Sequence, residues 1–214
     1  MDLTILMAAP DAPLKELLFK VETGLVEAGF RHDFSVLRAG YDVEREVFDE
    51  RMPTEEVRVE GGFDELPPEV SLWEGVAFEF WRDSLSLSLM IGRIGAGQCV
   101  NAWVDVPLRM LTRLLETQEE GRLYGALGEI AGAIGAAGGY VHTELAFHTL
   151  PLDRAQTAFV DMPEYPGEAA LLGILPAQAV GPEQVAARFP AFTAKLSTRG
   201  YWVLTQDLAG TLLP

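Results

Sequence analysis

Residues 121–139, GRLYGALGEIAGAIGAAGG, place two classes of residue at helical spacing at the same time. Large aliphatic residues recur at steps of four, three and four, which is the spacing of one face of an α-helix. These residues are Leu123, Leu127, Ile130 and Ile134. Five glycines recur at similar steps and, at about 100° per residue, fall nearly opposite the aliphatic row. These glycines are Gly121, Gly125, Gly128, Gly132 and Gly135.

The glycine face predicts a close contact with another backbone. A glycine inside a helix costs about 1 kcal/mol relative to alanine, so several in one helix need an offsetting interaction. Two interpretations are open: the helix is buried on two sides within one domain, or Gly125, Gly128 and Gly132 form a contact with a second copy or a protein partner. A membrane helix is not expected, because the apolar run is shorter than roughly 20 residues and Glu129 interrupts it.

The composition restricts the classes of partner. The chain has 214 residues and a net charge of −16, which argues against non-specific nucleic-acid binding and is compatible with a cationic partner. Its single cysteine, Cys99, excludes an internal disulfide and fits a reducing cytoplasm. The N-terminal segment has no basic region, so no signal peptide is predicted. We expect one cytoplasmic domain over 1–214, with a possible sub-boundary in the loop 61–74.

The first third of the chain predicts a strand at 3–8 and a helix that Asp11 caps and Gly29 ends. Period-two patterns at 41–48 and 55–62 then predict a hairpin with one solvated face. Between Asp42 and Glu79 there are thirteen Asp or Glu residues against three Arg. This acidic surface is either a solvated sheet face or a docking surface for a partner. The residues that we select from it for docking are Glu44, Glu46, Glu56 and Glu60.

Alternating residues predict three antiparallel strands at 76–81, 84–91 and 100–106. Glycines at 92–97 resemble a phosphate loop, but they join two strands instead of a strand and a helix, so no nucleotide or other cofactor is predicted. Trp81 and Trp103 fall on the sheet face opposite Phe78 and Phe80. They would form an exposed aromatic patch unless that face is covered.

The remainder of the chain alternates helices and strands. A helix is predicted after Pro107, a capping box at Thr117 and Glu120 begins the glycine-striped helix, and 138–139 ends it. Strands follow at 140–150, 169–175 and 201–208, with a helix at 182–196. The chain is therefore predicted to be an α+β fold with a mainly antiparallel central sheet and helices on one face. Its terminal β-α-β units flank the three-stranded meander.

Residues that could carry chemistry lie mainly on the strand at 140–150. At period two, His142, Glu144 and His148 point to one face, and these side chains suit a metal or acid–base site. One strand cannot close a tetrahedral site alone, so other ligands would have to come from elsewhere. A nucleophilic Cys99 is disfavoured, because a strand lacks the helix N-terminus or sharp turn that usually activates a thiol.

Two classes of function follow from these observations. The first is a non-enzymatic, acidic, cytoplasmic binding protein that docks a protein partner or self-associates. In composition and class it is similar to immunity proteins that neutralise bacterial toxins, to antitoxins and to chaperones, and no motif links it to such a family. The alternative is a metal-dependent hydrolase that uses His142, Glu144 and His148.

Overall fold

The computed structural model describes residues 2–42, 47–49, 55–94, 99–141, 149–155 and 172–206. These residues form an eleven-stranded sheet in the order β10-β11-β9-β8-β1-β7-β6-β5-β2-β3, with β4 also paired to β2. Neighbouring strands are antiparallel in each described pair. The strands are β1 (Asp2–Pro10), β2 (Ser35–Asp42), β3 (Val47–Asp49), β4 (Glu56–Arg58), β5 (Gly75–Arg82), β6 (Leu85–Ile94), β7 (Cys99–Pro107), β8 (Gly138–Val141), β9 (Leu172–Pro176), β10 (Thr193–Leu196) and β11 (Tyr201–Thr205).

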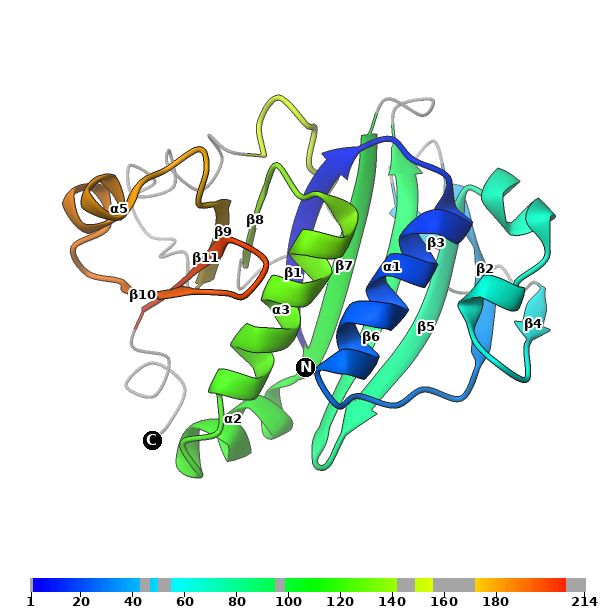
Figure 1. Cartoon of the computed structure of the whole chain (residues 1–214), viewed down its shortest axis with the longest axis horizontal. Coiled ribbons are helices and arrows are strands. Elements are labelled where there is room, and N and C mark those ends of the chain that lie inside the picture. Colours follow the sequence, from blue (N-terminus) through cyan, green and yellow to red (C-terminus); the bar gives the residue numbers. More distant parts are fainter. Residues whose placement is uncertain are drawn as a thin grey trace.

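Two long helices, α1 (Leu14–Glu27) and α3 (Gly121–Ile134), lie side by side across one face of this sheet, as Figure 1 shows. The shorter α2 (Leu108–Glu116) precedes α3, and α5 (Pro182–Arg188) packs against the opposite face at the β9–β11 end. Two 3-10 turns, η1 (Phe63–Glu65) and η2 (Pro68–Leu72), lie beside α1. The predicted α+β fold with a mainly antiparallel sheet is confirmed.

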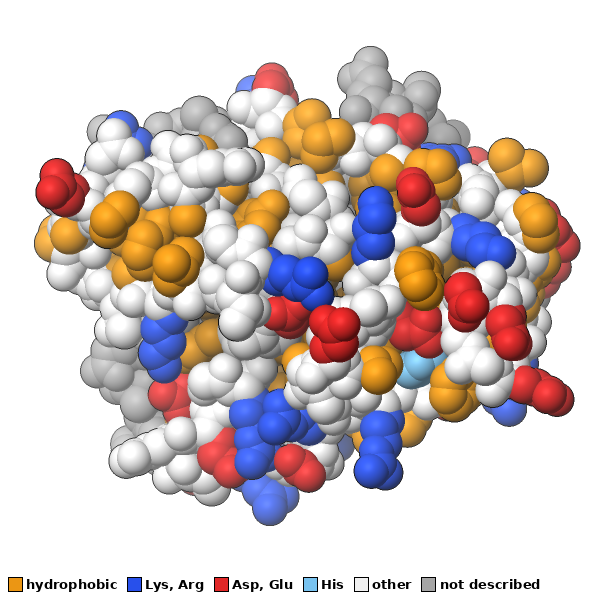
Figure 2. Space-filling model, in the orientation of Figure 1, with side chains coloured by type: hydrophobic (Ala, Val, Ile, Leu, Met, Phe, Trp, Pro, Cys, Tyr) orange, Lys and Arg blue, Asp and Glu red, His pale blue; other side chains and the backbone are white. Residues whose placement is uncertain are grey.

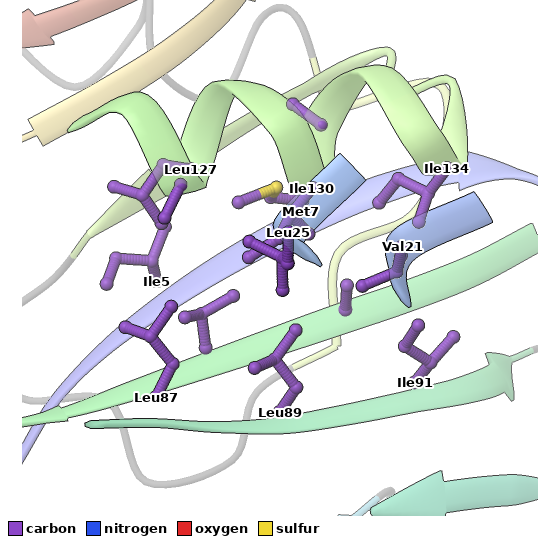
Figure 3. Packing of buried hydrophobic residues seen from close by; sticks show 14 of the residues in the cluster. Ile5, Met7, Val21, Leu25, Leu87, Leu89, Ile91, Leu127, Ile130 and Ile134 are labelled. Carbon is purple, nitrogen blue, oxygen red and sulfur yellow. The ribbon is translucent and has the colours of Figure 1, made fainter. Parts of the chain in front are cut away.

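The aliphatic row of α3 covers the sheet, as its spacing predicted. Leu127, Ile130 and Ile134 point from the helix toward side chains of β1 and β6, including Met7 and Leu89 (Figure 3). All five side chains are buried. Burial of this kind is worth about 1.5 to 3 kcal/mol for each large aliphatic side chain. The segment at 61–74 contributes to the same core through residues Phe63, Leu66, Val70 and Trp73.

A second apolar cluster lies on the opposite face of the sheet. There Trp103 is buried against Leu150 and Ala155 of the segment at 149–155. Asn101 holds this segment in place: its Nδ2 donates to Leu150 O at 2.8 Å, and Leu150 N donates to Asn101 Oδ1 at 2.7 Å. The face is therefore covered at Trp103, which is buried, whereas Trp81 is 38% exposed, so the two tryptophans do not form the aromatic patch that an uncovered face would give.

Three predicted helix boundaries differ from the structure. Pro13 occupies the N-cap of α1, and Asp11 instead pairs with Arg93 at 3.1 Å. Thr117 is the C-cap of α2, where its hydroxyl donates to a backbone carbonyl of that helix, so it does not form a capping box with Glu120. The helix α3 ends before Gly135, whose left-handed φ of 67° is accessible to glycine without strain.

The glycines at 138–139, which were predicted to end α3, instead begin β8, where a side chain at Gly139 would lie 2.7 Å from Leu6 O. The predicted end of one other segment was also wrong. The predicted helix at 182–196 stops at Arg188, because Pro190 disfavours helical backbone at Phe189, and Thr193–Leu196 form β10.

Among their described residues, the acidic segments at 41–48 and 55–62 do not pair with each other as a hairpin. Instead β3 pairs with the end of β2, and β4 pairs with its beginning. A period-two pattern identifies a strand but not its partner, because the partner depends on where the chain reverses.

Candidate functional site

The glycine face of α3 is partly closed by the chain itself. A side chain at Gly128 would lie 2.3 Å from Cβ of Ser197, and one at Gly132 would lie 2.5 Å from Cβ of Arg199. Both contacts come from the turn between β10 and β11. The sequence left open whether Gly128 and Gly132 contact a partner or another part of the same domain. In the structure they lie against the C-terminal hairpin of the same chain.

Ion pairs hold this hairpin against both long helices. Arg199 Nε lies 2.6 Å from Glu129 Oε2 on α3, and its Nη2 lies 3.3 Å from Glu27 Oε2 on α1. The Thr198 hydroxyl donates to the other Glu129 oxygen at 2.5 Å. Gly24 makes room for this carboxylate, because a side chain there would lie 3.2 Å from Glu129 Oε2. The glycines of α1 and α3 therefore make room for the ion pairs between the β10–β11 turn and the two long helices.

The N-terminal end of the same face is open. Apart from the adjoining backbone of α3 and the neighbouring residues, a Cβ added at Gly121 or Gly125 would meet no described atom within 4 Å. These glycines line a groove of about 670 Å³ with Tyr124 and Lys195, whose ammonium lies 4.9 Å from the centre of the Tyr124 ring. Of the three glycines that were predicted to form a contact, Gly125 is thus the one that the described residues leave uncovered.

The predicted acidic residues are divided between described and undescribed segments. Glu44 and Glu46 lie outside the described residues, while Glu56 and Glu60 are exposed. Glu56 lies 2.6 Å from Arg58 Nε and accepts a bond of 2.8 Å from the Ser35 hydroxyl. These two bonds lower the pKa of Glu56. Its charge is therefore partly compensated within the chain.

A groove of about 730 Å³ crosses the sheet face opposite α1 and α3. Ser88 and Met90 line it, and they alternate along β6 with Leu87 and Leu89, which face the helices. We call this feature the acidic groove. Its other lining residues that enter the argument are Asp33, Leu37, Arg38, Glu56, Glu79 and Asp105.

The acidic groove combines carboxylates with an exposed apolar side chain. Four of its lining residues are acidic and one, Arg38, is basic. Asp33 accepts from the backbone N–H of Ser35, and Glu79 accepts a long bond of 3.4 Å from the Ser88 hydroxyl. Leu37 is 49% exposed. By contrast, acidic and basic side chains are interspersed on the helix-covered face, which Figure 2 shows.

A buried polar pair, which the sequence analysis missed, lies beneath α1. His32 Nε2 is 2.8 Å from Glu22 Oε1, and Phe63 N donates to Glu22 Oε2 at 2.7 Å. Both side chains are almost entirely buried, and the imidazole lies among the rings of Phe34 and Phe80. Glu22 lies next to Val21 on the predicted apolar stripe of α1, and this position was the available signal that its carboxylate is buried.

The residues of the enzymatic alternative are not placed by the structure. His142, Glu144 and His148 lie outside the described residues, so this hypothesis stays a prediction. Within the described segments, no three His, Cys, Asp or Glu side chains are arranged to hold a metal ion. Cys99 is buried in β7, and burial raises the pKa of its thiol, which disfavours the reactive thiolate. No described helix is long and apolar enough to cross a bilayer.

Comparison with known proteins adds little to this geometry. No protein-family model matches the sequence, and no curated protein matches it. Among solved structures, the chain is similar to the Pseudomonas aeruginosa T6SS protein PA0821, with 14% sequence identity and a TM-score of 0.45. The match covers 95% of this chain but 64% of that one, so the chain spans less than two thirds of its neighbour's length. A likeness this distant supports no assignment of function.

Proposed function

We propose that this chain is a non-enzymatic protein that binds a basic segment of a protein partner through the acidic groove. The observation that carries the proposal is the concentration of four carboxylates around the exposed Leu37 on the sheet face opposite the long helices. The role has the general character of an immunity protein, an antitoxin or a chaperone. It is proposed for the cytoplasm, the compartment that the sequence predicts.

The charges of the groove favour a cationic partner. Arg58 pairs with Glu56 and also interacts electrostatically with Asp33. Asp33 and Glu79 accept hydrogen bonds from neutral donors, a backbone N–H and a hydroxyl. The net charge of −16 adds a long-range attraction for basic proteins. Complementary charge of this kind mainly raises the association rate and selects the partner.

Leu37 supplies the apolar part of the proposed contact. Interfaces place an apolar core inside a polar rim, and a few central side chains carry most of the binding free energy. Leu37 lies on β2, opposite Ala77 of β5 on one side and Glu56 of β4 on the other. An apolar side chain of the partner can cover it while basic side chains reach Asp33 and Glu79.

The test is affinity capture from the native cytoplasm with two charge-matched variants. Asp33→Asn combined with Glu79→Gln removes two groove charges and keeps an oxygen acceptor at each position. Glu69→Gln combined with Glu116→Gln removes two exposed charges that do not line the groove. We expect the wild type and the second variant to capture the same basic protein and the groove variant to lose most of it. Equal capture by all three proteins refutes the proposed site.

A further inference from the structure

A second hollow lies beside α1 and differs in chemistry from the acidic groove. It has a volume of about 660 Å³, and we call it the aromatic hollow. Its floor contains the buried Glu22 and His32, and its walls include two exposed aromatic rings. The lining residues used below are Glu22, His32, Phe34, Asp64, Trp81 and Arg31.

The Glu22 carboxylate at the floor of the hollow accepts hydrogen bonds at both oxygens. His32 Nε2 lies 2.8 Å from Glu22 Oε1, and Phe34 N donates to His32 Nδ1 at 3.2 Å. The other Glu22 oxygen accepts from the backbone N–H of Phe63. Within the described residues, no lysine or arginine forms an ion pair with Glu22.

The aromatic rings of the hollow are positioned by the backbone. Phe34 has a φ of 59°, a left-handed conformation that is strained for a bulky residue. In this conformation its ring centre lies 4.4 Å from that of His32 and 36% of the residue stays exposed. Trp81 is held nearby, because its backbone pairs in both directions with Arg31. Strained residues of this kind concentrate at binding sites.

The Glu22 carboxylate lies against the backbone of Gly62. A Cβ added at Gly62 would lie 3.2 Å from Glu22 Oε1 and 3.4 Å from Oε2, so a side chain larger than glycine would have to displace the carboxylate. The described acidic residues lining the hollow are Glu22, Glu27 and Asp64, against one basic residue, Arg31. Aromatic faces around an acidic floor are the arrangement that binds organic cations, through cation–π contact and charge.

From this arrangement we propose that the aromatic hollow takes the side chain of an arginine that belongs to the protein partner. The inference rests on the proposed partner-binding function and names a second contact for the same partner. The guanidinium stacks on Trp81 and Phe34 and approaches the carboxylates of Glu22 and Asp64. Its aliphatic stem covers the apolar wall that Val26 contributes.

The experiment titrates the purified protein with two capped tripeptides, Gly-Arg-Gly and Gly-citrulline-Gly. Citrulline has nearly the shape of arginine and no charge. The readout is the NMR signal of the Trp81 indole N–H, assigned with Trp81→Phe. We expect the arginine peptide to shift this signal and to bind about tenfold more tightly than the citrulline peptide, because the neutral citrulline group lacks the cation–π and charge attraction of the guanidinium.

Matched variants locate the peptide. Trp81→Ala and Asp64→Asn are expected to weaken arginine binding several-fold, measured by calorimetry. Phe19→Ala and Glu69→Gln remove an exposed aromatic ring and an exposed acid that do not line the hollow, and they should leave it unchanged. Glu22→Gln removes the charge at the floor and is also expected to weaken arginine binding. If Glu22→Gln does not fold, the result for Trp81→Ala decides the test.

The two proposals fail separately. Equal binding of the two tripeptides, or arginine binding that Trp81→Ala leaves intact, refutes the hollow even when partner capture depends on Asp33 and Glu79. Conversely, arginine binding in the hollow with partner capture that is insensitive to the groove variant refutes the acidic groove alone.

Discussion

Alanine substitutions on the glycine face of α3 test whether this face seats the C-terminal hairpin. At Gly128 a methyl group would lie 2.3 Å from Ser197 Cβ and 2.8 Å from its hydroxyl, both too close for ordinary contact. Ser197 is tied to the hairpin by its backbone bond to Tyr201, so the whole turn has to move. Such overpacking costs about 1 to 3 kcal/mol. The gain in helix propensity returns about 1 kcal/mol.

Gly128→Ala should therefore lower the free energy of unfolding. An overpacking cost of about 2 to 3 kcal/mol, less the gain of about 1 kcal/mol in helix propensity, leaves a net loss of about 1 to 2 kcal/mol. In a chain of this length each 1 kcal/mol changes Tm by about 2 to 4 °C. The measurement is urea denaturation followed by circular dichroism, with m-values compared between variants.

Gly125→Ala is the matched control on the same face of the same helix. Apart from the adjoining backbone of α3 and the two neighbouring residues, no described atom lies within 4 Å of the place its methyl group would take. Only the helix propensity therefore changes, and stability should rise by up to about 1 kcal/mol. The difference in sign between the two variants is the diagnostic result. If Gly128→Ala stabilises the protein as much as Gly125→Ala does, the hairpin does not pack on α3 and the reasoning is refuted.

Three further predictions concern stability. Asn101→Ala leaves the N–H and C=O of Leu150 without their side-chain partner and should cost about 2 to 4 kcal/mol in urea denaturation, whereas an unchanged midpoint would show that 149–155 is held by other contacts. Gln118→Gly should stabilise the protein by about 0.5 to 1 kcal/mol in the same assay, because Gln118 follows α2 with a φ of 58°, and a loss of stability would contradict the strain. Burial raises the pKa of Tyr124 to about 12. The raised pKa of Tyr124 in the folded state has no effect on the free energy of unfolding below the unfolded pKa of about 10. Between about pH 10 and 12 the unfolded state loses the phenol proton first, so the free energy of unfolding declines over this range. Tyr124→Phe should flatten the decline of stability in this range, and an identical slope would refute it.

The elements of the central sheet were predictable because their side chains carry the pattern themselves. Leu87 and Leu89 alternate with serines along β6, and that alternation depends only on strand geometry. The same holds for the aliphatic row of α3. Boundaries were less predictable at Thr117 and at the end of α5, because a capping pattern or an apolar stripe also occurs where the chain continues differently.

The candidate sites were mostly hidden from the sequence. Glu56 was identified by its place in an acidic run, but Asp105 lies on a strand distant from it in sequence and joins it only through the order of the sheet. Glu22 and His32 are ten positions apart, on a helix and in the loop that follows, and neither lies in a motif. Charge and burial at these sites depend on elements that meet only in the folded chain.

The glycine stripe of α3 illustrates both kinds of information. Its spacing alone determined that one helical face lacks side chains and that something packs closely against it, because repeated glycines would otherwise destabilise the helix. Only the tertiary structure decided what packs there: the turn at Ser197 and Arg199 covers Gly128 and Gly132 and leaves Gly125 open. Local spacing determines the shape of a helix surface. The segment that packs on this surface lies more than sixty residues away in the sequence, and no local pattern there indicates the contact.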